Sequence, residues 1–320
     1  MSRGENAMAG RAVFDANLMK RYQLPESEKK KYLETRHAKT LLHALPSEIR
    51  TELVRSFLAG KPLVANGGVA VIDFFKQNST IIPALAEYPG TFTMLEKMYQ
   101  FEDVTHPVDV FFSKSGPGGI SLKSRYNLVN EMMVQHVREI LKQQEKCLVL
   151  DLGSGPGRNC IDVTLSNPDF ADRVEFHCID TDPEAISYGQ KLVEQHGLKN
   201  IKFVAKSMAR LHRDYKGTVD YGLIIGVLCG LNTQERTGLL KLVKPYFRPG
   251  ARVIGAGLLD RMLDLDLLCS YILREVAGWI LQHPPIGIVQ DAYEGAGYMY
   301  EGYVQEQPTR CYEIGIGCVQ

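Results

Sequence analysis

The residues best suited to chemistry lie in the segment Val149 to Asn159, VLDLGSGPGRN, which combines one acidic residue with three closely spaced glycines. An apolar run ends in the carboxylate of Asp151, and the glycine-rich turn follows directly. Glycines at this point allow a strand to turn tightly into a helix and leave backbone N–H groups open to a ligand. A second apolar run, Val174 to Ile179, ends in Asp180, 23 residues after the last glycine. A βαβ unit places a carboxylate at about this distance against ribose hydroxyls, so the two carboxylates predict a site for a nucleoside-containing cofactor.

The spacing of the glycines indicates which cofactor. A dinucleotide-binding turn reads G-x-G-x-x-G, and its third glycine lets helix and strand pack closely beside a pyrophosphate. Here the residue three after Gly155 is Arg158, and Gly157 comes one position too early. Asp151 at the strand end would repel a pyrophosphate but would attract a cationic amine. No G-K-S/T follows, which argues against a phosphate-binding P-loop. The structural alternative is an ordinary strand-to-helix turn that binds nothing.

The D-x-G-x-G-x-G pattern that starts at Asp151 resembles motif I of the class I S-adenosylmethionine-dependent methyltransferases. The resemblance covers about residues 122–320 and implies S-adenosyl-L-methionine as the cofactor. It also implies a set of contacts at the carboxyl ends of the strands and in the helix before them. In that set, the residues that hold the methionine part are Asp151, Gly153, Ser154, Gly155 and Gly157, and those that contact the methionine carboxylate and the sulfonium are Arg125 and Tyr126. The residues that hold the ribose are Asp180 and Thr181, and those on the adenine side are Ser207, Met208, Gly226 and Leu228.

Several of these positions have simpler explanations. Many family members carry Gly-Asp where this chain has Lys206-Ser207, so the contact with adenine has a weaker anchor here. Arg125 and Tyr126 would otherwise only cap or pack the start of their helix. Asp182, beside the ribose carboxylate, is expected to cap the following helix instead of binding the ligand.

The segment after the fourth predicted strand bears on the methyl acceptor. Gly226 to Gly230 reads GVLCG, whereas amino-methyltransferases acting on nucleic-acid bases or protein glutamine amides tend to carry Asn/Asp-Pro-Pro-aromatic there. We therefore expect O-, N- or C-methylation of a small molecule. Two alternatives stay open: a transferase that takes another group from the same cofactor, and a non-catalytic cofactor-binding scaffold.

Methyl transfer from a sulfonium needs positioning more than a nucleophile on the protein, although an oxygen or amine acceptor can require a general base. The candidates for that base are Tyr126, His283 and Tyr298. The alternative is that His283 is a loop residue and that the tyrosines only pack.

Strands alternate with helices from Leu122 onward, which predicts a mostly parallel sheet covered by helices. The predicted strands are Cys147–Leu152, Val174–Asp180, Ile201–Ala205, Val219–Gly226 and Arg252–Gly257, followed by a hairpin of Gly297–Gln305 and Arg310–Val319. The fold class is therefore α/β, a Rossmann-like doubly wound seven-stranded sheet with a C-terminal antiparallel hairpin. The family resemblance places strand seven between strands five and six.

Residues 1–120 are predicted to form a mostly helical domain, and residues 121–320 the methyltransferase domain. The helical part would serve as a cap over the acceptor or as an oligomerisation domain, for example in a homodimer. Ser113 to Gly119, SKSGPGG, is predicted to be a flexible loop that marks the boundary or acts as a mobile lid. Pro25–Leu45 and Asp260–Leu281 are predicted as helical stretches.

Composition narrows the class of protein further. Among 320 residues, 37 Lys and Arg balance 37 Asp and Glu, so no basic surplus favours nucleic acid or an anionic membrane. The seven cysteines form no C-x-x-C pair and the histidines no metal-binding spacing, which predicts reduced core thiols, no metal site and a cytoplasmic location. The apolar runs are too short to span a membrane, and the start, MSRGENAMAGR, lacks a signal-peptide core.

Overall fold

The computed structural model of the chain describes residues 16–87, 92–100, 104–278 and 281–320. The first residues, MSRGENAMAGR, and the prediction about them lie outside this part. The chain divides into two compact units. A helical unit contains the chain as far as Lys123 together with residues 258–285 and 307–311, and a sheet unit contains residues 124–257, 286–306 and 312–320.

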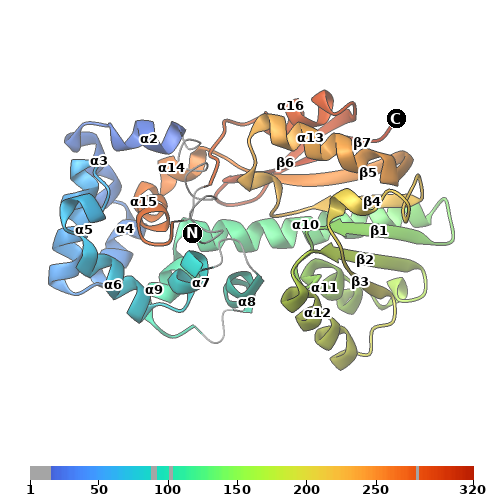
Figure 1. Ribbon diagram of the computed structural model, residues 1–320, viewed down its shortest axis with the longest axis horizontal. Coiled ribbons are helices and arrows are strands. Elements are labelled where there is room, and N and C mark those ends of the chain that lie inside the picture. Colours follow the sequence, from blue (N-terminus) through green and yellow to red (C-terminus); the bar gives the residue numbers. More distant parts are fainter. Residues whose placement is uncertain (1–15, 88–91, 101–103, 279–280) are drawn as a thin grey trace. The chain divides into compact units, whose positions relative to one another are not determined.

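The sheet unit is built on seven strands in the order β3-β2-β1-β4-β5-β7-β6 (Figure 1). Neighbouring strands from β3 to β5 pair in parallel, and β6 pairs with β7 antiparallel. The predicted fold is therefore confirmed, including strand seven between strands five and six. The strands are β1 (Cys147–Leu152), β2 (Val174–Asp180), β3 (Ile201–Ala205), β4 (Val219–Ile224), β5 (Phe247–Leu258), β6 (Met299–Gln305) and β7 (Tyr312–Cys318).

The burial of residues along the strands agrees with this strand order. Every residue of β4 is buried, as expected for a central parallel strand covered on both faces, whereas the edge strand β6 contains only exposed and half-buried residues. The helices of this part of the chain are α10 (Pro117–Leu141), α11 (Arg158–Ser166), α12 (Pro183–Gln195), α13 (Thr233–Val243) and α16 (Ile288–Gly295). The predicted cap at Asp182 is confirmed, since its side chain accepts from the backbone N–H groups of Glu184 and Ala185. Asn232 forms a capping box with Glu235 at the start of α13.

The helical unit has its own core. Tyr271 packs edge-on against Tyr22 and Phe57, with ring centroids 5.3 and 5.6 Å away, and its hydroxyl donates to the Lys61 carbonyl at 2.6 Å. The helices are α2 (Ala16–Tyr22), α3 (Glu26–Leu33), α4 (Arg36–His43), α5 (Ser47–Ala59), α6 (Val69–Asn78), α7 (Ile81–Glu87), α8 (Phe92–Gln100), α9 (Pro107–Val110), α14 (Arg261–Leu265) and α15 (Leu267–Glu275).

Two of the predicted helical stretches are each interrupted. Pro25–Leu45 divides into α3 and α4, because the Thr35 side chain accepts from the Ala38 N–H and caps a new helix. Asp260–Leu281 divides into α14 and α15 at Asp266, which caps the second helix through the Cys269 N–H at 3.0 Å. Residues 279–280 of that stretch lie outside the described part.

The prediction of a flexible loop at Ser113–Gly119 was wrong. Residues Phe111–Ser115 form a π-helical turn, and α10 begins at Pro117, a position where proline needs no backbone N–H. Ser113 is fully buried, and its hydroxyl donates to the Asp109 carbonyl at 2.7 Å. A Cβ at Gly119 would collide with the carbonyl of Phe112. The glycine therefore permits close packing inside a helix and does not loosen the chain.

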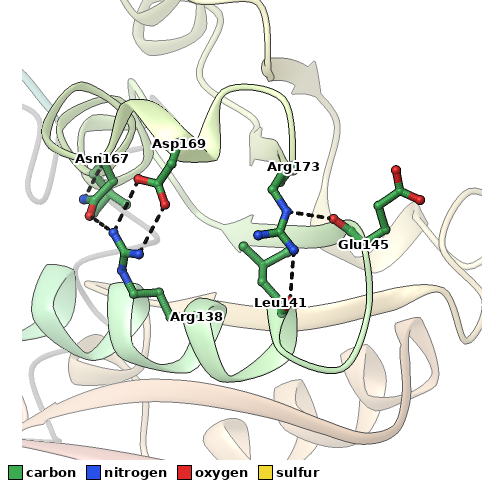
Figure 2. Close-up of polar contacts among 7 residues, drawn as sticks. Arg138, Leu141, Glu145, Asn167, Asp169 and Arg173 are labelled. Atoms are coloured by element: carbon green, nitrogen blue, oxygen red, sulfur yellow. Dashed lines mark hydrogen bonds and ion pairs between the residues drawn. The ribbon is translucent and has the colours of Figure 1, made fainter.

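The end of α10 is tied to the loops around β1 and β2 by two arginines (Figure 2). Arg138 contacts Asp169 at 3.2 Å and donates to Asn167 Oδ1 at 3.0 Å. Arg173 donates to the carbonyl oxygens of Leu141 and Glu145 at 2.9 and 3.2 Å. Arg173 thus satisfies a carbonyl at the end of α10 that has no partner within the helix.

No helix in the described part of the chain combines the length and the apolar character that crossing a bilayer requires.

Candidate cofactor-binding site

The candidate site is centred on the glycine-rich turn between β1 and α11. Gly153, Gly155 and Gly157 have φ values of 75°, 55° and 69°, a left-handed conformation that only glycine adopts readily. The N–H groups of Gly153 and Ser154 both donate to the Ile179 carbonyl, at 2.8 and 3.1 Å. The turn is therefore held against the end of β2.

The absence of side chains in the turn also allows other segments to approach. A Cβ on Gly153 would collide with Cγ2 of Val227, from the segment after β4, and would lie 3.6 Å from Cε of Met208. A Cβ on Gly157 would lie 2.7 Å from the Sγ of Cys178. Both glycines are required by space as well as by backbone conformation.

Asp180 links the turn to the end of β2. Its Oδ2 accepts from the Gly155 N–H at 2.7 Å and its Oδ1 from the Asp182 N–H at 3.0 Å. An ionised carboxylate offers about four acceptor positions, so these bonds fix its orientation and leave capacity for ligand hydroxyls. Asp180 is half-buried and Thr181 beside it is exposed. Their assignment to the ribose stays a prediction.

Asp151, at the end of β1, is 4% exposed. Burial raises the pKa of its carboxyl from 3.8 to about 7, and the charge of Asp180 adds to this increase, while a contact with Cys160 opposes it. The Cys160 Sγ donates to Asp151 Oδ2 at 3.7 Å. A cationic ligand group would stabilise the charged carboxylate and reverse the shift, so the environment of Asp151 suits an amine.

The ends of β3 and β4 carry the residues assigned to the adenine side. Ser207 caps the short turn Met208–Arg210 by accepting from the Ala209 N–H at 3.3 Å. Gly226 is exposed with φ 84°, and Leu228 is fully buried. The Leu228 carbonyl accepts from Nε of Arg236 at 2.8 Å, which anchors the segment after β4. Sequence reasoning missed Arg236 because a buried arginine on a helix has no motif.

Arg125 and Tyr126 lie in α10. Arg125 is buried, with its guanidinium carbon 4.8 Å from the centre of the Tyr312 ring. The Tyr126 hydroxyl donates to Asp162 Oδ2 at 2.5 Å and to the Arg158 carbonyl at 3.2 Å. Burial and the neighbouring Asp162 charge raise the Tyr126 pKa far above its ordinary value, which does not suit a general base. Asp162 had not been identified from the sequence.

The other two candidate bases lie elsewhere. The Tyr298 hydroxyl donates to the Leu240 carbonyl at 3.1 Å, and burial raises its pKa well above the ordinary value. Its environment is that of a packed core residue. His283 belongs to the helical unit, where its carbonyl accepts from Asn17 Nδ2 at 2.6 Å. A catalytic role for His283 stays a prediction.

Comparison with known proteins identifies the domain. Residues 143–255 match the family model described as a methyltransferase domain, and no curated protein matches the chain. A Bordetella parapertussis structure described as a possible exported protein aligns with TM-score 0.58 and 13% identity over 92% of this chain and 97% of that one. Magnesium protoporphyrin IX methyltransferase from Synechocystis PCC 6803, with bound SAH, aligns with TM-score 0.52 and 13% identity over 75% of this chain and 100% of that one.

The same Synechocystis enzyme with bound SAM aligns with TM-score 0.51 and 12% identity, over 76% of this chain and 98% of that one. At these identities the solved structures establish the fold, and the match to the family model establishes the type of domain. The SAH and SAM bound to the Synechocystis enzyme are that protein's ligands, and the motif I resemblance predicts the same cofactor for this chain. Residues 143–255 of this chain therefore form a methyltransferase domain.

Proposed function

We propose that the protein transfers the methyl group of S-adenosylmethionine to a small-molecule acceptor. The observation that carries this proposal is the segment after β4, Gly226 to Gly230. It forms a left-handed glycine followed by the short turn Leu228–Gly230, in place of the Asn/Asp-Pro-Pro-aromatic sequence associated with nucleic-acid bases and glutamine amides. The formal net charge of zero gives no support to a nucleic-acid acceptor either.

We assign the cofactor contacts to residues of the sheet unit. Asp151 would pair with the cofactor amine, the turn at Gly153–Gly157 would contact the methionine part through its backbone, and Asp180 would accept from the ribose hydroxyls. Met208, next to Gly153, would pack on the adenine. These groups hold the sulfonium in place, and positioning supplies much of the acceleration in a displacement that discharges a positive charge.

We propose that the helical unit serves the acceptor or a second copy of the chain, because every residue assigned to the cofactor belongs to the sheet unit. We also propose a cytoplasmic location, which suits the seven buried free thiols. Light scattering on the purified full chain would separate a monomer from a homodimer.

The test of the acceptor class uses cofactor labelled in the methyl group and, separately, in the methionine carbon chain. The purified full-length protein is incubated with a cell extract, and ultrafiltration then separates small molecules from proteins and nucleic acids. We expect methyl label to enter new compounds in the filtrate. Methyl label retained with macromolecules would refute a small-molecule acceptor, and chain label in a new product would indicate transfer of a different group.

A further inference from the structure

We propose that Asp151, Cys160 and Cys178 form a zinc-binding site, and that zinc bound there excludes the cofactor. The ligand atoms of these residues all lie within 4.8 Å of one another, and all three residues are buried. The second half of this proposal rests on the proposed function, in which Asp151 pairs with the cofactor amine.

The three residues come from the elements that the glycine turn connects. Asp151 is the residue before the last in β1, Cys160 lies in the first turn of α11, and Cys178 on β2 is the direct cross-strand partner of Asp151. The Cys178 Sγ lies beneath the turn, 2.7 Å from where a Cβ on Gly157 would be. The strand register and the start of α11 therefore direct two sulfur atoms and one carboxylate toward the same point.

The donor set suits a borderline-soft ion. Zinc binds thiolates at about 2.3 Å and carboxylate oxygens at about 2.0–2.2 Å, which puts neighbouring ligand atoms of a tetrahedral site about 3.5–4 Å apart. The Cys160 Sγ and Asp151 Oδ2 are already 3.7 Å apart. Magnesium and calcium prefer oxygen ligands alone, so two sulfur atoms disfavour them.

Binding is an exchange of protons for the ion. Zn²⁺ forms two bonds to sulfur and one to a carboxylate oxygen, and water takes the fourth position. Cys160 and Cys178 each release one proton to solvent, and Asp151 releases one more where its carboxyl is protonated. The carboxylate of Asp151 cannot then pair with an ammonium group. Zinc and S-adenosylmethionine are therefore predicted to compete for Asp151.

A metal site here differs from the prediction of no metal site made from the residue spacing. The positions 151, 160 and 178 match no metal-binding spacing, because one of the ligands is supplied through strand pairing. Only the folded sheet brings them together.

The first experiment needs no variant. Full-length protein stripped with chelator is titrated with Co²⁺, whose absorption reports thiolate ligands and tetrahedral geometry. We expect one equivalent of Co²⁺ to bind with a sulfur-to-cobalt charge-transfer band, Zn²⁺ to displace it, and S-adenosylmethionine to abolish the band. Absence of the band would overturn the site, and a band that saturating S-adenosylmethionine leaves unchanged would overturn the competition.

The second experiment compares Cys160→Ala and Cys178→Ala with Cys147→Ala, which removes a buried thiol from the opposite end of β1. We expect zinc affinity to fall in the first two by more than the tenfold to hundredfold, roughly, that loss of an outer-shell partner costs, and to stay unchanged in the control. Equal zinc affinity in all folded variants would overturn the proposal. Cofactor affinity tests the proposed function separately, and it is measured once with chelator present and once with zinc added instead. Cofactor binding that is equal in the two measurements would refute this inference alone. No cofactor binding with chelator present would refute the cofactor assignment.

Discussion

The replacement Asp180→Asn tests the ribose assignment, because it removes a charge and one acceptor oxygen while keeping the shape of the side chain. Asp180 already accepts from Gly155 and Asp182 at 2.7 and 3.0 Å. In the variant, one carboxamide oxygen can still accept from one of these groups, and the NH₂ group must face the other donor. Both the protein and the ligand therefore lose part of their hydrogen bonding.

The size of the effect follows from the kind of bond that is lost. A hydrogen bond to a charged group contributes about 1.5–3 kcal/mol, which corresponds to a rise in Kd for S-adenosylmethionine of about tenfold to 150-fold. Loss of one backbone contact to Asp180 should lower the free energy of unfolding by about 1 kcal/mol. The two effects are measured separately, by calorimetric titration with cofactor and by urea unfolding without it.

Asp182→Asn is the matched control. It removes the same charge two residues away, and Asp182 caps α12 through the N–H groups of Glu184 and Ala185. Asparagine caps helices about as well as aspartate, so the fold should be retained and Kd should change by no more than about twofold. Unchanged cofactor affinity in folded Asp180→Asn would refute the ribose assignment. An equal loss in both variants would show that overall charge, and no specific contact, determines binding.

Three further perturbations test the same reasoning. Gly153→Ala should weaken cofactor binding and stability far more than Gly197→Ala, since both positions have positive φ but only the Cβ at position 153 would collide with Val227. Calorimetry measures the binding and thermal unfolding the stability, and equal losses in the two variants would contradict the prediction. Because the Asp151 pKa rises from 3.8 to about 7 on folding, the contribution of Asp151 to stability is full below about pH 4 and is lost as the pH rises toward 7. Urea unfolding of the wild type and of Asp151→Asn should differ in pH dependence, with a slope of at most about 1.4 kcal/mol per pH unit. Parallel curves of unfolding free energy against pH would contradict this prediction. Arg173→Ala should cost about 1 kcal/mol of unfolding free energy with no change in cofactor affinity, and a change in affinity would mean that the end of α10 is coupled to the site.

The sheet was predictable because its signals are local. Apolar runs such as Cys147–Leu152 and Val174–Asp180 correspond to buried strands, and the glycine spacing at Gly153–Gly157 marks the turn that follows β1. The cap at Asp182 was predictable because capping depends on residues two or three positions away. Patterns that extend over only a few neighbouring residues therefore predict the order of strands and helices along the chain.

The features that escaped prediction depend on tertiary contacts. Pro117 and Gly119 resemble loop residues, yet one starts a helix and the other makes room for the carbonyl of Phe112. The bond from Tyr126 to Asp162 spans 36 residues and turns a candidate base into a buried hydrogen-bond donor. Arg236 anchors the segment after β4 through a backbone carbonyl, a role that residue type does not reveal.

The helical unit combines segments that are far apart in the sequence, and this affects how its core forms during synthesis. The partners of Tyr271 in that core, Tyr22 and Phe57, leave the ribosome more than two hundred residues before it does. At about 5–20 residues per second, the N-terminal helices wait on the order of ten seconds or longer before their core can close. During synthesis their apolar faces are open to chaperones, and nascent chains stopped before α15 should be captured by them and cut readily by protease.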